Sequence, residues 1–171
     1  ALAASIRLYE RHRAKMKLLY TLRRTHPSIL SGREMFSVVM SSFLMRKEDH
    51  LREIETLANV LKAETPVSDA RPNVLVAGSV CQVAGFIDAI EEAGALVADD
   101  DLCMGSRSYV LPPAPDGDPM DILTQLYMGR APCPAFHKPG YDPAENLLDR
   151  VKHGKVDGVV FLLTKFCDPF G

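Results

Sequence analysis

Several features that mark particular classes of protein are scarce or missing in this sequence of 171 residues. No stretch reaches the roughly 18 uncharged apolar residues that a membrane-spanning helix requires, so no membrane association is expected. Aromatic residues make up only 7% of the chain, which leaves few rings to stack on bases, and no nucleic-acid-binding motif is present. The sequence therefore predicts a protein that binds neither membranes nor nucleic acids.

Cysteine is sparse, and its spacing is irregular. The four cysteines are separated by 21, 29 and 33 residues, and no C-x-x-C pair occurs among Cys81, Cys103, Cys133 and Cys167. This spacing disfavours a zinc ribbon, a thioredoxin motif and a ferredoxin-type run. A disulfide framework is not expected in a cytosolic protein of this size. By composition alone each cysteine is a small buried hydrophobe, so position must decide whether any of them is functional.

The sequence also lacks the glycine-rich phosphate fingerprints. A short apolar run, Val74–Gly78, predicts a strand, but neither G-x-G-x-x-G nor G-x-x-x-x-G-K follows it. No dinucleotide site is expected there. Ser79 and Cys81 still follow the carboxyl end of this strand, so they are candidates to line a site.

No signal-peptide layout is present at the N-terminus, and a soluble cytoplasmic protein is the expectation. The chain starts without Met, and it stops at Gly171 soon after an apolar run with no helix to follow. We expect it to be a piece cut from a longer protein.

Net charge is −2 but unevenly distributed: residues 1–65 hold twelve Lys/Arg and seven Asp/Glu. The basic side chains gather in the first helical pattern and include Arg7, Arg11, Arg13, Lys15, Lys17, Arg23 and Arg24. We interpret them as the solvated face of an amphipathic helix, with attraction of phosphates as the alternative.

Hydrophobic periodicity divides the chain into two parts. Residues 1–65 carry apolar residues at spacings of three and four, which predicts helices. His26-Pro27 ends the first helix, and Ser31 with Glu34 forms a capping-box pattern before the next. Residues 66–73 contain two prolines and no periodicity, so we interpret them as a linker.

After the linker, strands alternate with helices. Strands are predicted at 74–78, 95–98 and 156–163, and helices at 86–93, 120–128 and 144–153. This order predicts an α/β fold: a helical segment (1–65) followed by an incomplete α/β subdomain (74–171). The subdomain would hold about three strands of a parallel, doubly wound, Rossmann- or flavodoxin-like sheet.

Three acids, Asp99–Asp101, follow the second predicted strand directly. Consecutive carboxylates could bind Mg²⁺ as in receiver domains, with Lys165 in the role of the lysine those domains need on a later strand. The alternative is a solvated turn whose aspartates cap backbone N–H groups. Arg107 could pair with these acids or with a phosphate.

The third predicted strand, Val156–Leu163, is apolar and β-branched enough to be buried on both faces. It leads into Lys165-Phe166-Cys167-Asp168-Pro169, and the carboxyl end of a parallel strand is where ligands gather. Lys165 would favour the thiolate of Cys167, and thiolates are the ligands of iron–sulfur clusters. Cys133, between two prolines, could form a rigid wall beside a site or lie on a surface loop.

Together these segments resemble a known family. Residues 99–107 (DDDLCMGSR) resemble its DDLCxGxR segment, Pro132-Cys133-Pro134 its PCP loop, and residues 156–169 its DGVIF…KFCDP signature. Residues 8–10, 22–23 and 29–34 are similar to its helical linker. The family is that of the 2-hydroxyacyl-CoA dehydratases, which includes benzoyl-CoA reductase subunits, and the likeness covers nearly the whole chain.

The resemblance implies an oxygen-sensitive lyase that acts on an acyl-CoA. In the family a [4Fe-4S] cluster lies between two subdomains, and an ATP-hydrolysing iron–sulfur activator charges it with one electron. The acyl-CoA then becomes a ketyl radical that expels its 2-hydroxyl group to give an enoyl-CoA. The KFCDP cysteine is a cluster ligand, which implies that role for Cys167, with other ligands and a second homologous subunit outside this chain. Ser79, Cys81, Cys103, Arg107, Cys133 and Lys165 are candidates to line the pocket.

Three alternatives remain at this point: a benzoyl-CoA reductase-type subunit, a non-catalytic accessory or interaction module that kept the fold, and a receiver-like domain built on Asp99–Asp101. Because one assigned thiolate cannot hold a four-iron cluster, we expect this piece alone to have neither cluster nor activity.

Overall fold

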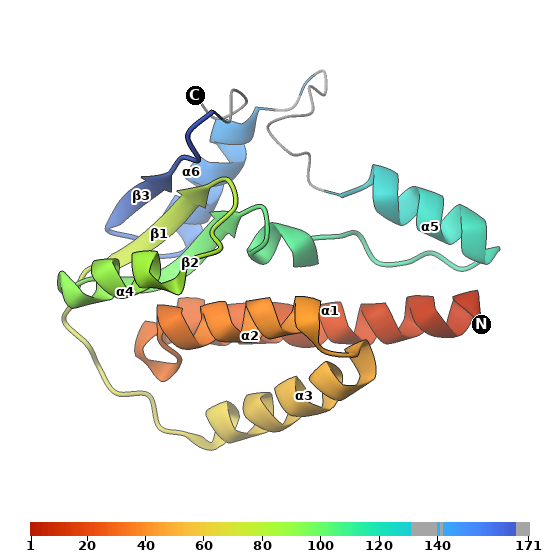
Figure 1. Cartoon of the computed structure of the whole chain (residues 1–171), viewed down its shortest axis with the longest axis horizontal. Helices are drawn as coiled ribbons and strands as arrows, with labels where there is room; N and C mark the ends of the chain where they lie inside the picture. Colours follow the sequence, from red (N-terminus) through yellow and green to blue (C-terminus); the bar gives the residue numbers. More distant parts are fainter. Residues whose placement is uncertain (131–139, 141, 167–171) are drawn as a thin grey trace.

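The N-terminal part of the chain is a set of packed helices, as predicted. The computed structural model describes residues 1–130, 140 and 142–166. It begins with α1 (Leu2–Thr25), a short 3₁₀ turn η1 (Pro27–Ile29), α2 (Gly32–Leu44) and α3 (Lys47–Ala63). Figure 1 shows these helices lying together below the sheet. None of the helices in the described part of the chain is both long and apolar enough to cross a membrane.

The remainder of the described chain is an α/β unit whose three strands are all parallel. In chain order it contains β1 (Asn73–Gly78), α4 (Ala84–Glu92), β2 (Leu96–Leu102), η2 (Ser106–Tyr109), α5 (Pro119–Met128), α6 (Pro143–His153) and β3 (Gly158–Leu162). The strand order is β2-β1-β3, and β1 pairs in parallel with both neighbours. This confirms the predicted fold class, an α/β fold preceded by a helical segment.

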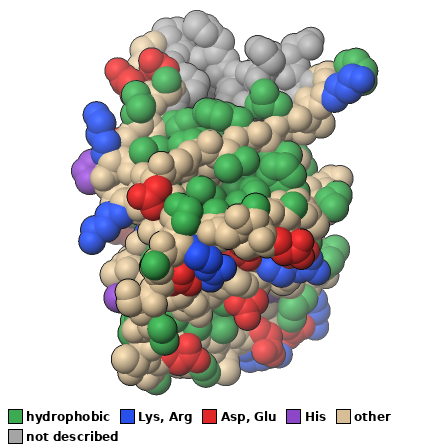
Figure 2. Space-filling view, turned by 90° about the vertical axis from the view of Figure 1, so that its left-hand side faces the viewer, with side chains coloured by type: hydrophobic (Ala, Val, Ile, Leu, Met, Phe, Trp, Pro, Cys, Tyr) green, Lys and Arg blue, Asp and Glu red, His purple; other side chains and the backbone are tan. Residues whose placement is uncertain are grey.

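Two strands differ from the prediction. β2 continues through Asp99, Asp100 and Asp101 to Leu102 and is buried throughout, so these acids do not lie in a turn. β3 is only partly buried, and the Phe161 side chain is 60% exposed. The prediction that β3 is buried on both faces was wrong, because it is an edge strand that pairs only with β1 in the described part of the chain. Figure 2, which views the molecule from the left-hand side of Figure 1, shows hydrophobic side chains gathered in the upper half of that face.

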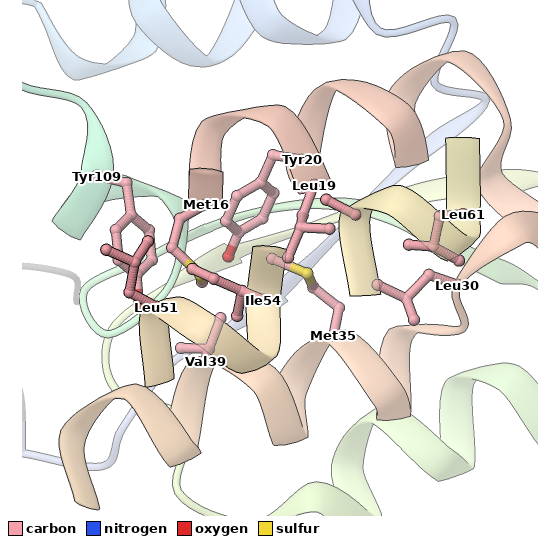
Figure 3. Packing of buried hydrophobic residues seen from close by; sticks show 11 residues of the cluster. Met16, Leu19, Tyr20, Leu30, Met35, Val39, Leu51, Ile54, Leu61 and Tyr109 are labelled. Carbon is pink, nitrogen blue, oxygen red and sulfur yellow. The ribbon is translucent and has the colours of Figure 1, made fainter. Parts of the chain in front are cut away.

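Residues 1–130, 140 and 142–166 form two hydrophobic clusters, and the larger lies between the helices. Figure 3 shows side chains from α1, α2 and α3 converging on it, with Tyr109 of η2 added at one end. Met16 and Leu19 are fully buried there, as expected for one apolar stripe on α1. Each such side chain contributes roughly 1.5–3 kcal/mol by leaving water. The core therefore joins the α/β unit to the helices through η2.

The start of α2 is held against the sheet. The predicted capping box is present: Ser31 Oγ accepts a bond from the Glu34 N–H (3.2 Å), and Glu34 Oε2 accepts one from the Ser31 N–H (2.8 Å). A β-carbon on Gly32 would lie 2.7 Å from the Val97 Cβ, so only glycine allows this approach to β2. The Gly32 N–H also donates to the Glu91 carboxylate of α4 (2.7 Å).

Two buried histidines join α1 to α3. His12 Nε2 and His50 Nδ1 lie 2.8 Å apart in a hydrogen bond, and His50 Nε2 lies 3.0 Å from the Val38 carbonyl oxygen. Burial, with Lys47 nearby, lowers the pKa of His12 to about 4. Burial also lowers the pKa of His50. Both imidazoles are therefore neutral in the folded chain at pH 7.

We expect this pair to make the fold sensitive to acid. In the unfolded chain a histidine has a pKa of about 6.5, so the unfolded state binds more protons than the folded state between pH 6.5 and pH 4. Stability should therefore fall as the pH falls from 7 to 5, by about 2 kcal/mol for His12 alone. Urea unfolding at several pH values measures this. His12→Gln should flatten the pH dependence and His153→Gln, at an exposed position, should not; an unchanged slope in His12→Gln would contradict the assignment.

Candidate functional site

The strand β2 carries three consecutive acids to the carboxyl-terminal edge of the sheet. Side chains alternate across a strand, so Asp99 and Asp101 point to one face and Asp100 to the other. All three are buried. Buried carboxylates must be neutralised or hydrogen-bonded, and the structure supplies both kinds of partner.

Asp100 faces the helical segment and is held mainly by hydrogen bonds. Its Oδ2 accepts the Tyr20 hydroxyl of α1 (2.7 Å), and its Oδ1 accepts the backbone N–H of Ser106 (2.7 Å). Burial and the neighbouring Asp99 charge raise the pKa of Asp100, while these two bonds act in the opposite direction. Burial and the adjacent carboxylate also raise the pKa of Tyr20, so the phenol remains a donor.

Asp99 and Asp101 share one arginine from α6. Arg150 Nη2 lies 2.7 Å from Asp99 Oδ2, and its Nη1 lies 2.9 Å from Asp101 Oδ1. Arg24, at the end of α1, adds an ion pair to Asp99 (2.8 Å). Burial disfavours the charge of Arg150, but the surrounding carboxylates outweigh it and raise the pKa. This bridge fastens α6 to β2 across residues far apart in the sequence.

Arg107 completes the arrangement from η2. Its guanidinium binds Asp101 with two bonds, from Nε (3.0 Å) and from Nη2 (2.6 Å), as the sequence suggested it could. Bidentate pairs of this kind fix orientation as well as charge. Together, Asp99, Asp101 and the three arginines Arg24, Arg107 and Arg150 form an arginine–aspartate cluster.

A Mg²⁺ site at these acids, one of the two interpretations of this segment, does not fit their contacts. Their oxygens are occupied by arginines, a tyrosine and backbone N–H groups, and the described residues contain no group of His, Cys, Asp and Glu side chains able to hold a metal ion. Lys165 lies in an exposed turn, with its Nζ 5.1 Å from the centre of the Phe166 ring rather than beside the acids. The receiver-like alternative therefore loses the feature on which it rested.

The interpretation of the basic residues of α1 as a solvated face was also wrong for the last two of them, Arg23 and Arg24. Arg23 is only 1% exposed and donates to the carbonyl oxygens of Leu30 (2.9 Å) and Val97. Arg24 belongs to the arginine–aspartate cluster. Arg23 therefore hydrogen-bonds the backbone of β2, and Arg24 neutralises its Asp99 carboxylate. These contacts explain why the acids of β2 tolerate burial.

Ser79 connects the carboxyl ends of all three strands. Its N–H donates to the Leu162 carbonyl of β3 (3.1 Å), and its carbonyl accepts the N–H of Cys103, just after β2 (3.2 Å). Its hydroxyl lies 2.5 Å from the Thr164 hydroxyl. Ser79 therefore fixes the geometry of the edge from which Cys81, Cys103 and Lys165 emerge, as a buried positioning group.

The two described cysteines face different spaces. Cys81 is buried beside a small cavity of about 30 Å³ between the sheet and α2, and its thiol donates to the Val83 carbonyl (3.5 Å). Burial raises the pKa of Cys81, which favours the thiol. Cys103 is partly exposed, lines a larger pocket and lies 3.8 Å from Arg107 Nη1. Cys133 and Cys167 lie outside the described residues, so their predicted roles stay predictions.

The larger pocket, of about 820 Å³, lies between α1, η2 and α5. Of the predicted lining residues, Cys103 and Arg107 are there, Cys81 is not, and neither Ser79 nor Lys165 borders it. Apolar side chains of α5, including Leu123 and Tyr127, form much of its wall. The sequence did not identify Tyr20 and Arg150 as partners of the three acids. The run of acids was itself a signal for both residues, because acids in a buried strand need hydrogen-bond donors.

Comparison with known proteins shows the family to which the chain belongs. A family model described as "2-hydroxyglutaryl-CoA dehydratase, D-component" matches residues 1–171. The chain belongs to this family. The segment that carries much of the arginine–aspartate cluster, residues 99–107, is one of those that carry the family resemblance.

Curated relatives of this family member are subunits of larger enzymes. The (R)-phenyllactyl-CoA dehydratase beta subunit of Clostridium sporogenes is 27% identical over 99% of this chain and 45% of its own length. A benzoyl-CoA reductase subunit from Thauera aromatica has the same identity and coverage. The beta subunit of (R)-2-hydroxyglutaryl-CoA dehydratase from Acidaminococcus fermentans is 22% identical over 46% of its length. The chain thus spans slightly less than half the length of these relatives.

Proposed function

We propose that this chain is the C-terminal portion of a 2-hydroxyacyl-CoA dehydratase subunit that removes water from a 2-hydroxyacyl-CoA to give an enoyl-CoA. The observation that carries the proposal is the family match over the entire chain, together with relatives that are dehydratase subunits. The reaction would proceed through a ketyl radical, formed when an ATP-dependent activator supplies one electron. Loss of the 2-hydroxyl group as hydroxide and of a proton from carbon 3, followed by return of the electron, would make the net change the loss of water. A second homologous subunit would complete the enzyme, in a cytoplasmic, anaerobic metabolism.

The cofactor is part of the proposal. A [4Fe-4S] cluster supplies single electrons when bound, and Cys167 is the residue of this chain proposed to ligate it. The residues described by the structure do not form a cluster site by themselves, since Cys81 and Cys103 face separate spaces. What they supply is a rigid strand edge, held by Ser79 and the arginine–aspartate cluster, directly before the Cys167 segment.

A benzoyl-CoA reductase-type subunit is the second candidate, favoured by the relative from Thauera aromatica. The full-length protein, purified without oxygen together with its partner subunit and activator, separates the two. Mass spectrometry of the products from a 2-hydroxyacyl-CoA and from an aryl-CoA is the measurement. We expect an enoyl-CoA from the 2-hydroxyacyl-CoA. A ring-reduced thioester from the aryl-CoA would instead favour the reductase. The absence of product from both substrates would favour a non-catalytic accessory module.

The isolated chain should hold no stable cluster. Cys167 is the one thiolate assigned to the cluster here, and four-iron clusters need four ligands. Anaerobic incubation with iron and sulfide, followed by absorbance and iron analysis, should therefore give no stoichiometric iron–sulfur product. A stable cluster with four irons per chain would contradict this and would make Cys81, Cys103 or Cys133 ligands as well.

A further inference from the structure

The pocket between α1, η2 and α5 has the size of a small-molecule site. Its volume of about 820 Å³ lies within the usual range for such sites. Leu111, Leu123 and Tyr127 contribute apolar wall, and three arginines, Arg13, Arg107 and Arg130, also border it. The pocket therefore combines apolar surface with positive charge.

The three arginines differ in how their charges are satisfied. Arg107 binds Asp101 with two bonds. Arg130 stacks on the Tyr127 ring at 4.0 Å and donates to its hydroxyl (3.0 Å). Arg13 is partly buried, and within residues 1–130, 140 and 142–166 its guanidinium makes no hydrogen bond or ion pair.

The neighbours of Arg13 on the same helix face are already engaged. Glu10, Arg13 and Lys17 follow at spacings of three and four on α1. Glu10 Oε1 accepts the Ala114 N–H (3.0 Å), and Lys17 Nζ donates to the Leu111 carbonyl (3.1 Å). These two bonds hold residues 111–114 along α1. The Arg13 side chain lies between Glu10 and Lys17 on the same helix face and borders the pocket. Burial lowers the pKa of Arg13 more than Glu10 raises it, so its charge lacks a full counterpart.

We propose that this pocket binds a small amphiphilic anion, a carboxylate or phosphate joined to an apolar body, with Arg13 as the partner of the anionic group. The apolar body lies against the α5 side chains, and Thr124 and Cys103 border the same space. A partly buried guanidinium without an anionic partner loses part of its hydration, which costs free energy. A bound anion offsets that loss through charge-assisted hydrogen bonds. This ligand class follows from the pocket alone, whatever reaction the full-length protein catalyses.

Calorimetric titration of the chain with phenyl phosphate, 3-phenylpropanoate and inorganic phosphate tests the proposal. We expect saturable binding of at least one of the two aryl anions and much weaker binding of inorganic phosphate, which has no apolar body. Arg13→Gln should weaken the binding about tenfold or more, and Arg13→Lys less, because it keeps the charge. Arg7→Gln, which removes an exposed charge from the same helix, should change it less than about twofold.

The location of the ligand is tested through Cys103. Binding should slow alkylation of Cys103 by iodoacetamide, as read by peptide mass spectrometry, and this test needs only the unaltered chain. Preference for one of the two aryl anions would identify the head group as phosphate or carboxylate. Binding of neither, equal binding by Arg13→Gln and the unaltered chain, or unchanged alkylation of Cys103 would each overturn the proposal.

Discussion

Arg150→Gln should destabilise the chain by about 3 kcal/mol. The guanidinium bridges Asp99 (2.7 Å) and Asp101 (2.9 Å), and its side chain is 14% exposed. Removing one partner of a buried ionic group leaves the others without compensation, which typically costs about 3–5 kcal/mol. Arg24 and Arg107 remain as partners of the two acids, so we expect the lower end of that range.

Urea unfolding of Arg150→Gln beside Lys152→Gln measures this effect. Lys152 is exposed on the same helix, so its replacement should change the free energy of unfolding by less than about 0.5 kcal/mol. The difference should persist in about 0.5 M salt, because buried pairs are screened little. Equal midpoints for the two variants would mean that the arginine–aspartate cluster does not hold α6 to the sheet.

Gly105→Ala should destabilise the chain at least as much as Arg150→Gln, for a steric reason. A β-carbon at this position would overlap Asp100 Oδ1, which already accepts the Ser106 N–H at 2.7 Å. The carboxylate cannot withdraw without losing buried hydrogen bonds, each worth about 1.5–3 kcal/mol when one partner is charged. We expect a loss of about 3 kcal/mol or more, with local disorder of η2.

Gly85→Ala is the matched control for this substitution. Gly85 lies in α4, where an added β-carbon would meet its nearest atom, in Val83, at an ordinary 3.9 Å. Alanine should therefore be neutral or slightly stabilising there, since it favours helix over glycine. Amide hydrogen exchange of residues 103–109 would reveal the local effect of Gly105→Ala. A melting temperature within about 2–3 °C of the parent, which corresponds to less than about 1 kcal/mol, would show that the backbone relaxes at little cost.

Local patterns were sufficient to predict the elements whose signals are local. The capping box at Ser31, the break at His26-Pro27 and the alternation of strands and helices all depend on neighbouring residues, and all are present. The fold class followed from that alternation. The family resemblance rested on longer segments and was confirmed over the entire chain.

What could not be predicted depends on contacts between distant residues. Three consecutive acids favour a turn by propensity. In the buried strand, arginines from α1, η2 and α6 pair with Asp99 and Asp101, and hydrogen bonds from Tyr20 and the Ser106 N–H satisfy Asp100. The partial exposure of β3 follows from its place at the edge of the sheet that the described residues form, which an apolar run does not specify. The separation of Cys81 from Cys103 likewise depends on how α2 and α5 pack around the sheet.

The ATP-dependent formation of enoyl-CoA by the full-length protein, with and without Cys167, tests the central claim most directly. With its partner subunit, activator and a 2-hydroxyacyl-CoA, the unaltered protein should form enoyl-CoA only when ATP and a reductant are supplied. Cys167→Ser should lower the rate at least about a hundredfold and reduce the iron bound, while the subunits still assemble. Full activity and full iron content in Cys167→Ser would contradict the account.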